Sequence, residues 1–268
     1  MICLTYLPTR WKMSRLSNPE LWTMGISEEI YEMTNNLLTT ISSKKALLFD
    51  LFHTLTPLEP TWKTAPSTSG MLGVSREDWN RQLLECSRER LVGKMTDPLK
   101  IIRDLAHAID PTISEDTIVR TTENRINQFA KSLINIPQVN VDVLTELKRS
   151  GKKLALISNA DVMEAQGWGQ SPIAKLFHET LFSCHVGWAK PEPEIYNLCM
   201  QQLGLAPDEC IFVGDGGSNE HEGARACGIT TVMVTGIIKE LWPNKVEGRM
   251  TQADYVIENL SELLDSEM

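Results

Sequence analysis

Residues 44–55 read KKALLFDLFHTL. Two lysines precede an apolar run, the run ends at the carboxylate of Asp50, and the following residues have the composition of a tight turn. A short continuous apolar run with polar boundaries is typical of a parallel strand that is buried on both faces. Three later stretches have the same form: KKLALISNA (152–160), ECIFVGDG (209–216) and ITTVMVTG (229–236).

Helical patterns separate these apolar runs. PEPEIYNLCMQQLGL (191–205) has apolar residues at helical spacing, and SNEHEGARACG (218–228) begins with a candidate N-cap, Ser218, and ends at a glycine. ADYVIENLSELLDS (253–266) predicts one further strand and helix. The alternation of strands and helices predicts an α/β fold with a doubly wound parallel sheet.

The chain divides into three predicted parts. Residues 61–138 read almost entirely as helix, which predicts a helical domain inserted between the first and second strands. Residues 45–60 and 139–268 form the predicted Rossmann-like core. Residues 1–44 are sparse in periodic apolar pattern, and we expect an N-terminal extension that ends in one docking helix.

Composition narrows the functional classes. The chain has 268 residues, is 42% hydrophobic and carries a net charge of −9, which repels phosphate backbones and anionic membranes. We therefore expect no nucleic-acid and no membrane partner. Six cysteines without a CxxC pair argue against a zinc site and a disulfide scaffold, and the first residues lack a signal-peptide pattern. These features predict a cytoplasmic protein, and they leave its oligomeric state open.

Polar side chains end three of the predicted strands: Asp50, Ser158 with Asn159, and Asp215. Each one alone is also typical of a turn or a helix N-cap. In open α/β sheets, however, ligands bind outside the carboxyl ends of the strands. Lys190 ahead of a predicted helix and Glu220 one turn after Asp215 add two charged groups to the same crevice. Together these residues favour a single site.

Four motifs occur in order: LLFDLFHTL, LALISNAD, AKPEPEIY and IFVGDGGSNEHEGARACG. With these motifs, residues 45 to 268 resemble the haloacid dehalogenase-like hydrolase superfamily. The helical insertion after the first motif is similar to the type-1 cap of that superfamily. Four ordered motifs are far more specific than any one of them, and they are most similar to the phosphatase-like branch.

The resemblance implies a Mg²⁺-dependent hydrolase that acts on a small phosphorylated metabolite. Asp50 would attack the phosphorus atom, and water would hydrolyse the resulting aspartyl-phosphate. Mg²⁺ would be held by Asp50, Asp215 and the backbone carbonyl of Phe52. Lys190 would neutralise charge and orient the nucleophile. Ser158 would donate its hydroxyl to a phosphoryl oxygen.

Two further residues have roles implied by the same resemblance. Asn159 is expected to bind substrate together with Ser158 and Lys190. Glu220 stands where the superfamily usually has a second acid, and we expect it to hold a metal-bound water or to orient Lys190. Its side chain is longer than that of aspartate, which makes direct metal ligation a weaker expectation.

Phe52 departs from the pattern of the superfamily. Most of its phosphatases have a second aspartate here, which protonates the leaving oxygen and later activates water. Phenylalanine does neither, and His53, the nearest titratable group, is expected to point to the opposite side. Phe52 fits an alternative, a metal-independent 2-haloacid dehalogenase-like hydrolase, but that alternative does not account for Asp215. A third hypothesis is that the protein is a catalytically degenerate binding module with the same fold. We favour the Mg²⁺-dependent phosphatase.

Overall fold

The computed structural model describes residues 36–62 and 66–264. Most of the predicted extension, residues 1–44, lies outside the described residues, so its prediction is not examined there. Residues 36–43 are helical, and Leu37 and Ile41 of this helix are buried in the main hydrophobic core.

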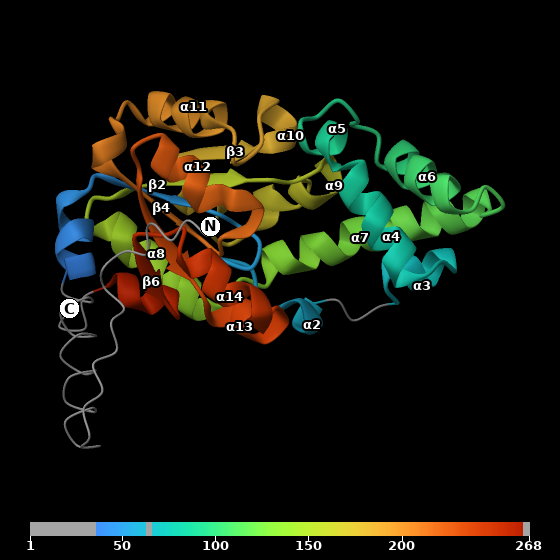
Figure 1. Ribbon diagram of the computed structural model, residues 1–268, viewed down its shortest axis with the longest axis horizontal. Helices are drawn as coiled ribbons and strands as arrows, with labels where there is room; N and C mark the ends of the chain where they lie inside the picture. The colour runs from blue at the N-terminus through green and yellow to red at the C-terminus, as the bar shows by residue number, and fades with distance from the viewer. Residues whose placement is uncertain (1–35, 63–65, 265–268) are drawn as a thin grey trace, which may run out of the picture.

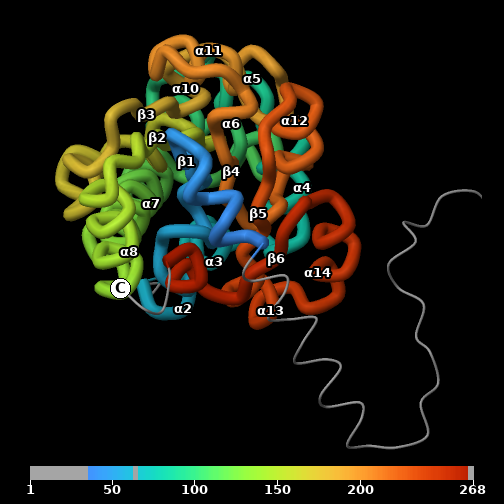
Figure 2. Tube along the Cα trace, turned by 90° about the vertical axis from the view of Figure 1, so that its left-hand side faces the viewer, coloured from blue at the N-terminus to red at the C-terminus, as the bar shows by residue number. Residues whose placement is uncertain are grey.

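Six parallel strands form one sheet in the order β3-β2-β1-β4-β5-β6, which can be followed across Figure 2. The strands are β1 (Ala46–Phe49), β2 (Lys153–Ser158), β3 (Glu179–Phe182), β4 (Cys210–Gly214), β5 (Thr230–Val234) and β6 (Tyr255–Ile257). Every strand that the apolar runs predict is present. The predicted α/β fold with a doubly wound parallel sheet is confirmed.

Helices cover both faces of the sheet because successive side chains of a strand point to opposite faces. Leu47 and Phe49 of β1 belong to a core shared with α8 (Gln138–Arg149), whereas Ala46 and Leu48 belong to a core shared with α11 (Pro193–Leu203). All four residues of β1 are fully buried. Asp50, the residue that directly follows this buried strand, is therefore placed in the protein interior.

A group of helices lies beside the sheet, between β1 and β2 in sequence (Figure 1). They are α2 (Glu59–Trp62), α3 (Thr68–Leu72), α4 (Arg76–Glu85), α5 (Ser87–Leu91), α6 (Pro98–Ile109) and α7 (Glu115–Ile134). Helices α3, α4, α6 and α7 enclose a second hydrophobic core around Trp79, Ile101 and Ile118, to which Met163 also contributes. We call α3 to α7 the cap; the residue limits 61–138 and the other domain limits stay predictions.

The other α-helices of the described residues follow the later strands. They are α9 (Val162–Ala165), α10 (Ser183–Val186), α12 (Glu220–Ala226), α13 (Gly236–Leu241) and α14 (Pro243–Met250). Among the described residues, no helix is both long and apolar enough to cross a bilayer.

One local prediction was wrong. Helix α12 begins at Glu220 with Asn219 as its N-cap residue, and Ser218 has a left-handed φ of 55° and does not cap it. The strand and helix predicted near the C-terminus are present as β6 and a short 3₁₀ helix, Leu260–Leu263, in the described part of the chain. The sequence reading also missed β3, whose first two residues are only half-buried.

Candidate active site

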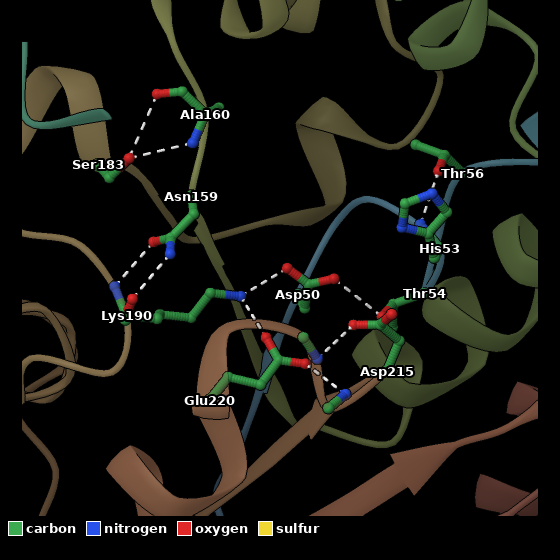
Figure 3. A network of polar contacts seen from close by, with 12 residues as sticks. Asp50, His53, Thr54, Thr56, Asn159, Ala160, Ser183, Lys190, Asp215 and Glu220 are labelled. Atoms are coloured by element: carbon green, nitrogen blue, oxygen red, sulfur yellow. Dashed lines mark hydrogen bonds and ion pairs between the residues drawn. The ribbon is translucent and has the colours of Figure 1, made fainter. Parts of the chain in front are cut away.

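The predicted strand-end residues lie together at one edge of the sheet. Asp50 follows β1, Ser158 ends β2, and Asp215 follows β4; β1 pairs with both of the other strands. Asp50, Asp215, Lys190 and Glu220 converge in Figure 3. All of these side chains are buried.

Lys190 joins two carboxylates at the centre of the site. Its Nζ lies 2.5 Å from Asp50 Oδ1 and 2.5 Å from Glu220 Oε2, and its side chain is 2% exposed. Burial lowers the pKa of Lys190, but the carboxylates of Asp50 and Glu220 more than reverse this and raise it above the ordinary value. Lys190 therefore stays charged and fixes the position of the Asp50 carboxylate.

Thr54 holds the other oxygen of Asp50, its Oγ1 donating to Asp50 Oδ2 at 2.9 Å. The chain turns sharply after β1: Leu55 N and Thr56 N both donate to Leu51 O. This turn brings the Thr54 hydroxyl back to the carboxylate. Asp50 is thus held from both sides, with one cationic and one neutral donor.

Three carboxylates in this cluster offer oxygens that suit a hard cation. One oxygen from each of Asp50, Asp215 and Glu220 lies within 4.8 Å of the other two. Gly217 N donates to Asp215 Oδ1 at 2.8 Å, and Gly216 N donates to Glu220 Oε1 at 2.8 Å, so backbone groups orient both acids. Carboxylate oxygens are the ligands that Mg²⁺ prefers, and this donor set fits it.

The charges of the cluster nearly balance. Burial raises the pKa of Glu220 well above its usual range; Lys190 opposes this, and the charges of Asp50 and Asp215 add to it. Arg249 of α14 supplies a second cation: its Nη1 lies 2.7 Å from Asp215 Oδ2 and donates to the Asp215 carbonyl at 3.0 Å. Arg249 was not among the predicted site residues.

Ser158 and Asn159 differ in their contacts. The Ser158 residue is fully buried, and its Oγ has no hydrogen-bond partner within the described residues. Asn159 has both ends of its amide engaged: Nδ2 donates to Lys190 O at 2.8 Å, and Oδ1 accepts from Lys190 N at 2.7 Å. Asn159 thus ties the end of β2 to the loop that carries Lys190, and its predicted contact with substrate stays a prediction.

The sequence model of the haloacid dehalogenase-like hydrolases matches residues 44–228, well over half of the chain. The chain belongs to this family. The match spans all the residues of the site described above except Arg249.

Individual relatives of this hydrolase carry phosphatase names. The chain is 27% identical to a glyceraldehyde 3-phosphate phosphatase of Methanopyrus kandleri over 82% of this chain and 96% of that protein. It is 26% identical to the pyrophosphatase PpaX of Oceanobacillus iheyensis over 83% of this chain and 96% of that protein. A dehalogenase crystal structure superposes with a TM-score of 0.59 at 21% identity, covering 82% of this chain and 96% of that one. At that identity, the superposition shows a shared fold.

Phe52 of this haloacid dehalogenase-like hydrolase packs against the cap. Its ring lies edge-on to Phe129 of α7, with centroids 5.5 Å apart. His53 has a left-handed φ of 64°, and its Nε2 lies 3.1 Å from Glu59 Oε1. Figure 3 places His53 beside Thr56, apart from the Lys190 cluster. Neither side chain thus takes the place of the usual aspartate beside Asp50.

Sequence reasoning missed Thr54 and Arg249. The spacing of Thr54 from Asp50 by one helical turn was a usable signal, because a turn of four residues returns a side chain to the starting residue. No comparable spacing points to Arg249, since it lies 34 residues after Asp215, on a helix that was not predicted from the sequence.

Proposed function

We propose that this protein is a Mg²⁺-dependent phosphatase that hydrolyses a small phosphate ester through a phosphorylated Asp50. The observation that carries the proposal is the fixed carboxylate of Asp50, held between Lys190 and Thr54 beside two further acids. The phosphatase names of relatives that align over most of the chain support the same reaction class.

The proposed reaction has two displacements at phosphorus. In the first, an Asp50 oxygen forms a bond to phosphorus while the bond to the leaving oxygen breaks, and that oxygen departs with the electron pair. In the second, water attacks the phosphorus atom, which releases phosphate and restores the carboxylate. Lys190 stays protonated throughout, holds the attacking group in line and offsets its charge against the anionic substrate.

The metal part of the proposal rests on the donor set. Asp50 and Asp215 would hold Mg²⁺, with the Phe52 carbonyl as the predicted third ligand and Glu220 orienting Lys190. Bound Mg²⁺ would neutralise phosphoryl charge. Ser158 completes the phosphate site, because its buried and unpartnered hydroxyl would gain an acceptor from a phosphoryl oxygen.

Phe52 narrows the class of substrate. Without a carboxyl group at this position, the departing oxygen receives its proton from solvent, so a substrate whose leaving group is stable as an anion is favoured. We propose that aryl phosphates are hydrolysed faster than simple alkyl phosphates.

The test combines turnover with binding of a phosphate analogue. Purified protein should hydrolyse an aryl phosphate in millimolar Mg²⁺ and lose this activity with a chelator. Beryllium fluoride, which mimics the phosphoryl group on a carboxylate, should bind only with Mg²⁺ and more weakly to Asp50→Asn. Asp215→Asn should bind Mg²⁺ more weakly, whereas Glu146→Gln, on the exposed side of α8, should match the wild type. Turnover that survives chelation would refute the metal assignment, and analogue binding without turnover would indicate a binding module.

A second candidate function is metal-independent dehalogenation, which Phe52 favours. A carboxylate oxygen of Asp50 would attack carbon, the halide would leave with the bonding electrons, and water would hydrolyse the ester. This chemistry needs no proton on the leaving group. Release of halide from a 2-haloalkanoate by chelated protein, and its loss in Asp50→Asn, would establish this candidate in place of the phosphatase.

A further inference from the structure

Arg249 reaches from α14 to the end of β4. Its Nη1 lies 2.7 Å from Asp215 Oδ2, and the same nitrogen donates to Asp215 O at 3.0 Å. The Arg249 side chain is 17% exposed and that of Asp215 is 6% exposed, so the pair is largely shielded from water. Charge-assisted hydrogen bonds of this kind are among the stronger ones in proteins.

The backbone next to Asp215 packs on the stem of Arg249. Gly216 has a φ of 81°, and a Cβ added there would lie 3.0 Å from Arg249 Cβ and 3.1 Å from its Cδ. The guanidinium Cζ lies 5.8 Å from the centre of the Trp242 ring, which in turn lies edge-on to His53 with ring centroids 4.9 Å apart. Arg249 is therefore held between the loop after β4 and the Trp242 ring, and it is not a free surface side chain.

The seated cation has a consequence for the metal site. Asp215 Oδ1 already accepts a hydrogen bond from Gly217 N, and Oδ2 accepts from Arg249. A divalent cation that binds Asp215 meets the positive charge of the guanidinium at the same carboxylate, and the two cations repel each other. Metal binding must then weaken or displace the Arg249 contact.

We propose that Arg249 is a resident counter-charge on Asp215 that competes with the divalent cation, so that α14 sets the metal affinity of the site. This inference rests on the proposed Mg²⁺ dependence. Arg249 is a positioning residue here, because it acts on the metal through Asp215 and does not contact the substrate. Its removal should leave three acids with only Lys190 to balance them, and the site should bind Mg²⁺ more tightly.

The experiment is calorimetric titration of the full chain with Mg²⁺, without substrate. Arg249→Met keeps the aliphatic stem beneath Gly216 and should bind Mg²⁺ about tenfold more tightly than the wild type. Arg249→Lys keeps the positive charge and should lie closer to the wild type. Arg149→Gln is the matched control: it removes one charge from the exposed end of α8, where Arg149 pairs with Glu146, and should change nothing. Thermal unfolding without metal reports whether each variant folds, and Arg249→Gln replaces Arg249→Met if the latter does not.

The outcomes separate this inference from the function on which it rests. Tighter binding by Arg249→Met than by Arg149→Gln supports the competition. Equal affinities in these two variants, with Mg²⁺ binding in the wild type, overturn the competition and leave the metal-dependent phosphatase standing. Mg²⁺ binding by Arg249→Met alone supports the competition and refutes metal dependence of the natural protein. Absence of binding in every variant overturns both.

Discussion

In the proposed reaction a carboxyl group at residue 52 would protonate the leaving oxygen, whereas the ring of Phe52 contacts Phe129 of the cap. Phe129 also stacks beneath the Arg125 guanidinium, whose Cζ lies 4.7 Å from the ring centre, and against Trp62. The aromatic side chain therefore provides an apolar contact between the loop after β1 and α7, and it provides no proton donor. Residue 52 can thus have two roles, one in proton transfer and one in packing, and Phe52 has only the packing role.

Phe52→Asp tests the chemical role of this position. If the missing general acid limits the reaction, the variant should hydrolyse alkyl phosphates about 10²-fold faster, with a much smaller gain for aryl phosphates, whose leaving groups need less protonation. The measurement is kcat/KM for one substrate of each type. Because the substitution also removes the contact with Phe129, Phe52→Leu is the packing control. Equal gains for both substrate types would contradict the explanation.

At the scale of elements, the carboxyl ends of the strands were predictable and the helical side of the site was not. Asp50, Ser158 and Asp215 stand where apolar runs stop, and parallel strands bring such ends to one edge. Thr54 looks like an ordinary turn residue, and only its spacing of four residues from Asp50 indicates that the two side chains could meet. The position of Arg249 depends on how α14 packs against the loop after β4, which is a long-range property that hydrophobic periodicity does not encode.

Short α9 carries a buried ionic cluster that links the core to the cap. Arg90 Nη1 donates to Asp161 Oδ2 at 2.7 Å, and Arg125 Nη2 donates to Glu164 Oε1 at 2.7 Å. Asp161 and Glu164 also form a capping box on the first turn of α9. Two cap arginines thus meet the turn that follows Ser158.

Glu164 should give this cluster a pH dependence. Burial, followed by the charge of Asp161, raises the pKa of Glu164 from 4.5 to about 7, and Arg125 opposes the shift. Because the folded state binds this proton more tightly than the unfolded state does, its contribution to stability is complete below about pH 4.5 and is lost as the pH rises to about 7. Glu164→Gln should remove this loss, so the variant should gain stability relative to the wild type by at most about 1.4 kcal/mol per pH unit in that window.

The measurement for Glu164→Gln is the free energy of unfolding in urea at several values between pH 5 and 8. Glu146→Gln, which changes an exposed acid of α8, serves as the control. Parallel pH profiles for the wild type and Glu164→Gln would show that Glu164 titrates normally.

At the scale of the whole molecule, α5 and the turn after it join the cap to α10 and to the loop that carries Lys190. Arg88 of α5 pairs with Glu192, whose other oxygen accepts from Ala189 N at 2.9 Å, one residue before Lys190. Gly93 lies directly against the carbonyl of Cys184 in α10, the short helix that follows β3. The cap therefore contacts the core in the same region that positions the loop of Lys190.

Gly93→Ala should disturb this contact of the cap with the core, and Gly73→Ala is its matched control. Both glycines have a left-handed φ, 70° and 72°, so either alanine should cost about 1–2 kcal/mol of stability through backbone strain. A Cβ on Gly93 would also lie 2.0 Å from the Cys184 oxygen, whereas one on Gly73 meets nothing within 4 Å. Gly93→Ala should therefore cost at least about 1 kcal/mol more. The kcat/KM of Gly93→Ala for an aryl phosphate should fall, while its Mg²⁺ affinity should stay unchanged because the three acids lie in the core. If Gly93→Ala and Gly73→Ala lose the same stability and the same activity, the contact between Gly93 and Cys184 does not position the cap.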